Sequence, residues 1–163
     1  MTPIRIKDQD GNDIAQLRIA VLEPADSGAL LGLLARCSPT ALYRRFHGVT
    51  NGLFYAQQIV AAAEGRDSYV AWIGKECVGL GNLHVRDDTA DIGVLVEDDW
   101  QRRGVGTALL LALVRRVRER GSHSLRADVL EENRFVLPLL ARLGPAKTSV
   151  AAGSYTTLVD LVA

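Results

Sequence analysis

The amino-acid sequence predicts a single α+β domain, with a mixed, mostly antiparallel central sheet of about seven strands flanked by about four to five helices. Three strand-like runs at 69–73, 78–86 and 90–96 are separated only by short turns, which predicts an antiparallel meander. A long amphipathic helix pattern then covers about 105–120 and leads into a further strand at 124–130, as in a βαβ crossover. A chain of 163 residues with 48% hydrophobic residues suits one domain with a full core.

The flanking segments complete this layout. Alternating runs at 4–7 and 14–19 around the turn-rich DQDGND predict a hairpin. The other predicted elements are helices beginning near Pro24–Asp26, at 40–46 behind a Ser38-Pro39 cap and at about 54–63, a short helix ending at Leu143-Gly144, and strands at 147–151 and 155–162. Pro138 fits that short helix only if the helix begins near 135–137, because a proline deep in a helix removes a hydrogen bond.

Composition excludes several classes of protein. The 19 Lys and Arg residues balance 19 Asp and Glu residues, so we expect no nucleic-acid partner, and the basic run RRVRER reads as a solvated helix face. The apolar stretch 108–114 is too short to span a bilayer, so we expect no membrane partner. The start MTPIRIKDQDGND has no apolar signal region, which favours a cytoplasmic protein. Cys37 and Cys77 lack metal-ligand spacing, so we expect no metal site.

The most informative segment is DIGVLVEDDWQRRGVGTALLLAL, residues 91–113, in which a strand runs through a short loop into an apolar helix. The first amides of a helix have no intrahelical partner and carry the positive end of the helix dipole, so they form an anion site. Gly104 and Gly106 let a pyrophosphate approach this backbone, and Arg102 and Arg103 add positive charge. The alternative is a loop glycine pair with solvated arginines. The segment is neither a Walker loop nor a dinucleotide fingerprint.

QRRGVG at 101–106 resembles the acyl-CoA pyrophosphate motif of the GNAT superfamily of N-acetyltransferases, Gln/Arg-x-x-Gly-x-Gly/Ala. The order of predicted elements resembles that family over nearly the whole chain, which implies one GNAT-like domain over residues 1–163. A second segment, SPTALYRRFHG at 38–48, resembles Ser-Pro-x-x-x-Tyr-x-Arg-Phe in the GNAT domains of bacterial protein-lysine acetyltransferases. The alternative for that segment is a capped amphipathic helix without a further role.

The resemblance implies acetyl-CoA as cosubstrate and coenzyme A as product. In the family, the backbone of the strand before the motif pairs with the pantetheine arm, the motif binds the pyrophosphate, and an asparagine before the last helix contacts the cofactor arm. The cofactor-binding residues that it implies here are Leu95, Val96, Gln101, Arg102, Arg103, Gly104, Val105, Gly106, Thr107 and Asn133. Tyr43, Arg44 and Arg45 are candidates for the acceptor cleft. The last helix, FVLPLLARLG, has no tyrosine for the family's usual general acid, so that role is unassigned.

Asp91 aligns with a glutamate that is the proposed base in the protein-acetylating subgroup, with a side chain one methylene shorter. The register of the hairpin supports this position independently. If Asp87-Asp88 is a two-residue turn, then His84 faces Asp91 and Asn82 faces Gly93 on one polar face of the sheet. A carboxylate and an imidazole placed in this way predict a proton relay, and the alternative is an exposed surface pair. Nearby, Glu97, Asp98 and Asp99 are expected to be solvated loop acids.

The sequence therefore predicts an acyl-CoA-dependent N-acyltransferase that moves an acetyl group to a primary amine by direct attack in a ternary complex. A protein lysine is one candidate acceptor, and a small amine such as a polyamine, an amino acid or an aminoglycoside is the alternative within enzymes. A non-catalytic acyl-CoA sensor, and a protein that binds another phosphate ligand, are the alternatives from other classes. The last hairpin is a candidate edge for a homodimer.

Overall fold

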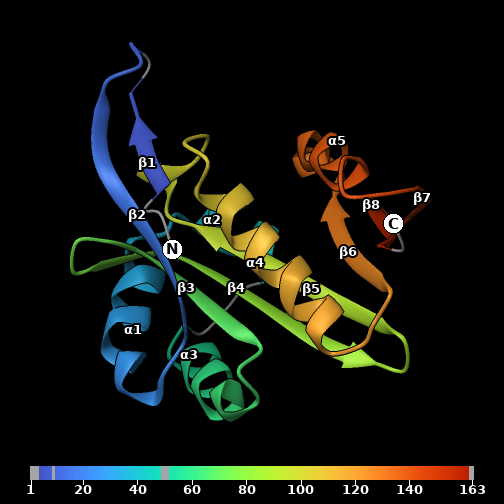
Figure 1. Cartoon of the computed structure of the whole chain (residues 1–163), viewed down its shortest axis with the longest axis horizontal. Helices are drawn as coiled ribbons and strands as arrows, with labels where there is room; N and C mark the ends of the chain where they lie inside the picture. Colours follow the sequence, from blue (N-terminus) through green and yellow to red (C-terminus); the bar gives the residue numbers. More distant parts are fainter. Residues whose placement is uncertain (1–3, 9, 49–51, 162–163) are drawn as a thin grey trace.

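The computed structural model describes residues 4–8, 10–48 and 52–161, and these form one sheet of eight strands in the order β1-β2-β3-β4-β5-β6-β8-β7 (Figure 1). The strands are β1 (Ile4–Lys7), β2 (Asp13–Val21), β3 (Ser68–Ile73), β4 (Glu76–Arg86), β5 (Thr89–Val96), β6 (Ser124–Leu130), β7 (Ala146–Ala151) and β8 (Ser154–Asp160). The helices of the described part are α1 (Ser27–Arg36), α2 (Pro39–Phe46), α3 (Gly52–Ala61), α4 (Val105–Glu119) and α5 (Leu137–Ala141). The predicted α+β class is confirmed, with one strand more than expected. Residue 162, the predicted end of the last strand, lies outside the described residues.

The β4–β5 hairpin has the predicted register. Asn82 pairs with Gly93 and His84 pairs with Asp91, as a two-residue turn at 87–88 requires. Asp87 adopts a positive φ of 53°, which the tight turn needs and which aspartate tolerates better than most residues. Because the side chains of a strand alternate between faces, this register places Asn82, His84, Asp91 and Gly93 on one face of the sheet.

The pairing between β5 and β6 is short. These strands run parallel, and only the residues 89–91 of β5 pair with residues 124–126 of β6. Beyond this point the two strands diverge, and β6 leaves the main sheet together with β8 and β7 (Figure 1). The divergence splits the sheet on its α2 side and creates the space that is described below as the candidate active site.

The two faces of the sheet carry different helices. Helix α4 packs on β4 and β5 from one side, while α1, α2 and α3 cover the other side (Figure 1). The close approach of α4 depends on Gly79 and Gly81, because a Cβ at these positions would lie 3.0 and 3.2 Å from the Cδ1 atoms of Leu109 and Leu113. Each leucine buried in this way contributes about 1.5–3 kcal/mol through removal from water. No helix in the described part of the chain has the length and apolar character needed to cross a bilayer.

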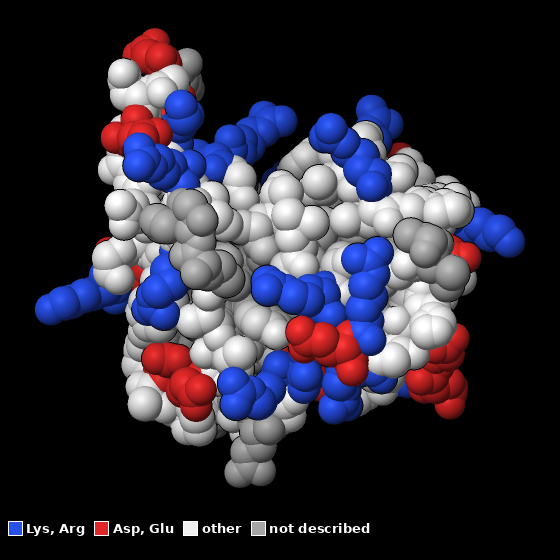
Figure 2. Space-filling view, viewed as in Figure 1, with Lys and Arg blue, Asp and Glu red and all other residues white. Residues whose placement is uncertain are grey.

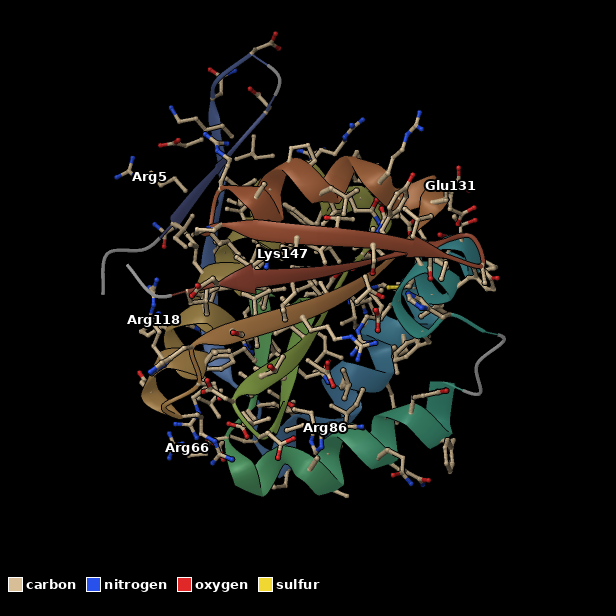
Figure 3. The ribbon with its side chains drawn as sticks, turned by 90° about the vertical axis from the view of Figure 1, so that its right-hand side faces the viewer. Arg5, Arg66, Arg86, Arg118, Glu131 and Lys147 are labelled. Carbon is tan, nitrogen blue, oxygen red and sulfur yellow. The ribbon has the colours of Figure 1, made fainter. Side chains whose placement is uncertain are left out.

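Two of the four arginines in the basic run at the end of α4 pair with acids. Arg116 pairs with Asp67 at 2.9 Å and with Glu119 at 3.4 Å, and Arg120 reaches Asp67 at 3.6 Å. Acidic and basic side chains accordingly lie side by side on this face of the molecule (Figure 2). The two edge strands of the sheet are β1, which carries Arg5, and β7, which carries Lys147 (Figure 3). All residues of β7 are exposed. The homodimer through this last hairpin stays a prediction.

Two local expectations about helix starts are confirmed. The Ser38 hydroxyl accepts a hydrogen bond from the amide of Ala41 and caps α2, with Pro39 in the first turn. Helix α5 begins at Leu137, which places Pro138 in its first turn, where a proline removes no hydrogen bond.

Two of the acids before α4 are hydrogen-bonded, and the expectation that all three are solvated is wrong for Glu97. Glu97 is buried and accepts a hydrogen bond from Nε of Arg36 on α1 at 3.1 Å. The amide and the hydroxyl of Ser38 donate to the Asp98 carboxylate at 2.8 and 2.6 Å. Both acids therefore tie the helices of one face to the turn that precedes α4, which is a tertiary contact that sequence spacing does not reveal. Asp98 and Asp99 are both exposed, as expected.

The Ser38–Asp98 contact predicts a pH-dependent stability. Burial by itself raises the pKa of the Asp98 carboxyl, but the hydrogen bonds from Ser38 outweigh it and hold that pKa below its ordinary value of 3.8. This contribution is therefore present above pH 3.8 and is lost as the pH falls below it. We expect Asp98→Asn to lower the free energy of unfolding by about 1 kcal/mol at pH 7 in urea denaturation, since the site is partly exposed.

The matched control for this experiment is Asp99→Asn, in the same turn, whose side chain makes no hydrogen bond or ion pair to the described residues. The difference between wild type and Asp98→Asn should shrink as the pH falls through 3.8. A difference that persists unchanged in acid, or is absent at pH 7, would contradict the role given to this contact.

Candidate active site

A cavity of about 980 Å³ opens where β5 and β6 diverge. Its lining comes from α2, from β5, from the loop and first turn of α4, from β6 and from the segment that follows β6. The lining residues that the sequence singles out are Arg44, Arg45, Asp91, Leu95, Val96, Gln101, Arg102, Gly104, Gly106, Thr107 and Asn133. One space therefore joins most of the predicted cofactor residues to the predicted base and to two of the predicted acceptor residues.

One end of the cavity is built from the start of α4. Arg102 and Gly104 both have positive φ, 59° and 88°, so the loop turns its successive amides in a common direction. The first helical hydrogen bond runs from the amide of Ala108 to the carbonyl of Gly104. The amides of residues 102–107 donate to no carbonyl in the described part of the chain. This run of free N–H groups at the positive end of a helix is suited to a pyrophosphate.

The side chains of the loop have different roles from one another. The Gln101 side chain donates from Nε2 to the carbonyl of Val96 at 3.0 Å and so fixes the loop to the end of β5. Arg102 lies exposed over the ring of Phe135, 5.6 Å from its centre. Arg103 is outside the cavity lining, because it donates to the carbonyl of Asp99 at 3.0 Å. Val105 is fully buried in the core, so only its backbone is available to a ligand.

The backbone of β5 presents unpaired groups to the gap. The amide of Glu97 donates to the carbonyl of Val78, which shows that odd-numbered residues of β5 direct their backbone groups toward β4. The backbone of Leu95 therefore faces β4, and its buried side chain lines the cavity. The backbone groups of Val94 and Val96 face the side from which β6 has diverged, and there the Val96 carbonyl accepts the hydrogen bond from Nε2 of Gln101. Of the predicted pair, Val96 therefore directs its backbone N–H toward the gap, and Leu95 does not.

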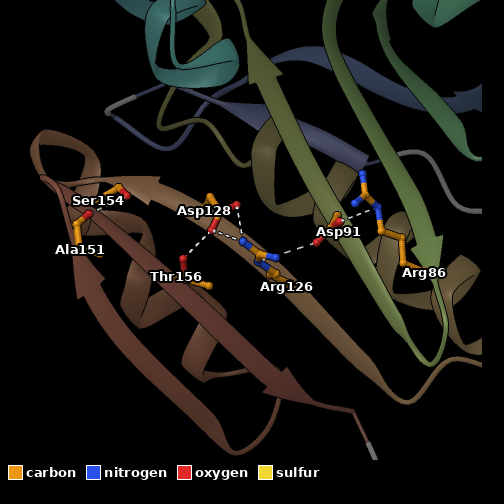
Figure 4. Close-up of polar contacts among 7 residues, drawn as sticks. All are labelled: Arg86, Asp91, Arg126, Asp128, Ala151, Ser154 and Thr156. Atoms are coloured by element: carbon orange, nitrogen blue, oxygen red, sulfur yellow. Dashed lines mark hydrogen bonds and ion pairs between the residues drawn. The ribbon is translucent and has the colours of Figure 1, made fainter.

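Asp91 lies at the point where the strands part, since its pairing with Arg126 is the last between β5 and β6. Its carboxylate is 3.7 Å from Nε of Arg86 and 3.9 Å from Nε of Arg126 (Figure 4). Arg126 also reaches Asp128 at 3.3 Å, and Asp128 accepts a hydrogen bond from the Thr156 hydroxyl at 2.7 Å. The Asp91 side chain is 37% exposed, so a substrate amine can reach it from the cavity.

His84 pairs with Asp91 in the predicted register, but its side chain is exposed and does not line the cavity. Within the described part of the chain, the His84 imidazole makes no hydrogen bond or ion pair with Asp91. The partners of the carboxylate are the two arginines instead. The structure thus pairs His84 with Asp91 in the sheet without joining their side chains.

Arg45 is the most unusual group of the cavity. Its guanidinium is buried, it donates to the Oδ1 atom of Asn82, and its Nε has no hydrogen-bond partner. The guanidinium lies directly over Gly93, where a Cβ would come within 2.6 Å of Nη2 and 2.7 Å of Nε. Burial lowers the pKa of Arg45 to about 10, so the group is still cationic at neutral pH. A largely buried charge without an anionic partner is unfavourable.

Of the other two predicted acceptor residues, Arg44 lies in the cavity lining and Tyr43 does not. Arg44 lines the cavity and pairs with Glu132 at 3.5 Å, and it also lies over the ring of Phe135. Tyr43 is 46% exposed and lies outside the cavity lining. Of the three predicted residues, the structure brings Arg44 and Arg45 to the site.

Several lining residues were not predicted, among them Tyr55, Arg126, Asp128 and Phe135. Asn82 was not predicted as a site residue either, and it accepts a hydrogen bond from the cavity residue Arg45. Asn82 was on the predicted polar face of the hairpin, so the register gave a signal for it. Arg126 and Asp128 alternate with buried residues on β6. This alternation predicts that the two side chains share a face of the strand, but it does not predict that this face lines the cavity. Tyr55 and Phe135 carried no signal, because their placement depends on how α3 and the segment after β6 pack.

The comparisons with known proteins agree with this geometry. The model of the acetyltransferase (GNAT) family matches residues 34–144, which is well over half of the chain. The GNAT domain of S. lividans PAT superposes with a TM-score of 0.78 at 23% identity, over 98% of this chain and 96% of that one. The yncA protein of Salmonella typhimurium, solved with acetyl-CoA, superposes with a TM-score of 0.69 at 18% identity, over 90% and 94% of the two chains. At such identities these structures show a common fold.

A third solved structure, the PaiA N-acetyltransferase of Thermoplasma acidophilum in complex with coenzyme A, has a TM-score of 0.63 at 12% identity, over 88% of this chain and 98% of that one. The family match defines the class, which is that of acetyltransferases. The chain belongs to the GNAT family of N-acetyltransferases.

The loop geometry predicts the effect of one added methyl group. A Cβ at Gly106 would meet Cγ2 of Val96 at an ordinary 3.7 Å, so Gly106→Ala should fold normally and gain helix propensity. The same methyl group obstructs the approach of a pyrophosphate to the amides of the loop. We expect calorimetric titration to show at least a tenfold loss of coenzyme A affinity, about 1.4 kcal/mol, with no fall in Tm.

Gly28→Ala, in the first turn of α1, is the matched control, because nothing lies within 4 Å of the added Cβ. It should leave coenzyme A binding unchanged. Full coenzyme A affinity in Gly106→Ala would count against the pyrophosphate assignment and favour another phosphate ligand.

Proposed function

We propose that this N-acetyltransferase moves the acetyl group of acetyl-CoA to a primary amine that is held on the α2 side of β5, with Asp91 as the base. One observation carries the proposal: a single cavity joins the free amides at the start of α4 to the Asp91 carboxylate at the parting of β5 and β6. A ligand with a phosphate end and a reactive end some distance away fits such a cavity. The cofactor contacts from residues 102–107, Val94, Val96 and Asn133 are part of this proposal.

The residues divide the chemistry among themselves. Acetyl-CoA supplies the acetyl group as a thioester. Asp91 takes a proton from the ammonium form of the acceptor, because an amine without a lone pair cannot attack. As the new C–N bond forms and the C–S bond breaks, a backbone N–H of β5 that faces the gap is placed to stabilise the carbonyl oxygen. The leaving thiolate takes a proton, and Tyr55 is the tyrosine that lines the described cavity and can donate one. The nitrogen of the new amide then releases its second proton, which restores the Tyr55 hydroxyl.

The charge of the cavity bears on the acceptor. Four arginines line it, at positions 44, 45, 102 and 126, against two aspartates, at positions 91 and 128. This excess of positive charge disfavours a polycation such as a polyamine or an aminoglycoside. Of the acceptors that the sequence leaves open, a protein lysine and an amino acid remain. The likeness of fold to a GNAT domain of S. lividans PAT, and of SPTALYRRFHG to such domains, keeps the lysine among them.

The role of Asp91 predicts a pH-dependent defect. Asp91→Asn keeps the shape of the side chain and removes its basicity, so kcat should fall about 100-fold or more while acetyl-CoA binding is retained. Because the free amine increases in concentration as the pH approaches its ordinary pKa of about 10.4, the rate of the variant should rise steeply with pH. The measurement is thiol release from acetyl-CoA over a panel of amines and lysine peptides between pH 6 and about 10.

Asp91→Glu is the conservative control, since it retains a carboxylate and adds the methylene found in the related domains, and we expect it to keep measurable activity. His84→Ala tests the relay in the same assay, and a matching loss would assign the imidazole a part in proton transfer. Full activity in Asp91→Asn at neutral pH would exclude Asp91 as the base. Tight acetyl-CoA binding without turnover on any amine would favour the acyl-CoA sensor instead.

A further inference from the structure

Among the cationic side chains of the described cavity, Arg45 stands out because its Nε is buried and it has no acidic partner. Arg102 is exposed. Nε of Arg44 is also buried without a hydrogen bond, but it lies 3.5 Å from the Glu132 carboxylate, and Arg126 lies beside Asp91 and Asp128. Arg45 has a neutral amide, Asn82, as its hydrogen-bond partner, and its buried Nε has none. Nε and the remaining N–H groups of a guanidinium form a fork that matches a carboxylate. The site is therefore incomplete without an anionic group.

The position of Arg45 decides which ligand can supply that group. Gly93, beneath the guanidinium, is three residues before Val96, which is a distance of about 10 Å along an extended strand. The phosphate-binding amides lie beyond Val96, on the α4 loop, so the cofactor phosphates belong to the opposite end of the cavity. An anion at Arg45 must come from the half of the cavity where the acceptor binds.

Asp91 and Gly93 lie on the same face of β5, about 6.6 Å apart. The acceptor half of the cavity thus presents one carboxylate, on Asp91, and one guanidinium, on Arg45, at a short separation. A small amino acid in its zwitterionic form carries the complementary pair of charges, an ammonium and a carboxylate, at a similarly short separation. The match requires both groups on one molecule, which a simple alkylamine does not have.

We propose that the acceptor is a small free amino acid whose carboxylate binds Arg45 while its ammonium group faces Asp91. The inference rests on the proposed function and narrows its acceptor. Gly93 contributes by having no side chain, which leaves the guanidinium its place on the sheet, and Asn82 orients it from the neighbouring strand. A side-chain lysine within a protein lacks a carboxylate at this spacing.

The test is a set of acceptors that differ in charge and in spacing. Glycine, β-alanine, 4-aminobutyrate and 5-aminopentanoate vary the separation of amine and carboxylate, and the amide of each removes the charge. We expect the wild type to favour an acid over its amide by about 100-fold in kcat/KM, with the best acceptor among the shorter acids. Arg45→Gln should abolish this preference by raising KM for the acid far more than KM for its amide.

Two further variants separate charge from folding. Arg45→Lys keeps the charge without the fork and should retain part of the preference for the acid. Gly93→Ala displaces the guanidinium without removing it and should reduce that preference as well, which provides a second route if Arg45→Gln does not fold. Arg115→Gln, an exposed position on α4, is the matched control and should behave as the wild type. Thermal unfolding reports whether each variant is folded.

Equal rates with an acid and its amide in the wild type would overturn the inference and leave the proposed function intact, as would a clear preference for a lysine peptide. A preference for succinyl-CoA over acetyl-CoA that disappears in Arg45→Gln would place the carboxylate on the acyl group and would also overturn it. The absence of transfer to any amine would contradict the proposed function itself. Titration of glycine into the protein saturated with coenzyme A then decides whether Arg45 still binds a carboxylate.

Discussion

The site depends on the short pairing between β5 and β6. Three residue pairs hold the strands parallel, and the backbone of β5 then continues without a partner strand on that side. Backbone groups without a partner strand need a side chain, water or a ligand to satisfy them, so such an edge is suited to a ligand. The parting of these strands therefore creates the cavity, exposes the backbone of Val94 and Val96 to it, and places Asp91 at its inner end. The cofactor and the acceptor meet where the sheet is interrupted.

Helix α2 connects the two halves of the site. Its cap, Ser38, is bonded to Asp98 in the turn that leads to the phosphate loop, and its last turn carries Arg44 and Arg45 into the acceptor half. The loop itself is fixed to β5 through the contact of Gln101 with Val96. Binding of a phosphate ligand at the loop and binding of an acceptor near Arg45 thus act on elements that share hydrogen bonds.

Local chemistry was predictable from the sequence, and packing across the sheet was not. A two-residue turn at 87–88 determines the β4–β5 register, and Pro138 determines where α5 begins, because both follow from backbone geometry. The loop glycines likewise indicate a phosphate site from their spacing alone. The burial of Arg45 over Gly93 depends on how α2 crosses β5, and nothing in the spacing of these residues reveals it. The spacing also did not reveal which residues of β5 direct their backbone groups toward the gap. The hydrogen bond from the Glu97 amide to the Val78 carbonyl shows that Val94 does so and Leu95 does not.

The most direct test of this arrangement is amide hydrogen exchange of the protein with and without coenzyme A, resolved by residue. The strand geometry predicts that the amide of Leu95, which faces β4, is protected in both states. The amides of Val94, Val96 and residues 104–107 should exchange quickly in the free protein and become protected when coenzyme A binds. Protection of Val94 that is already complete without the ligand, or no change along the loop on binding, would contradict the assignment of the parted strands as the cofactor site.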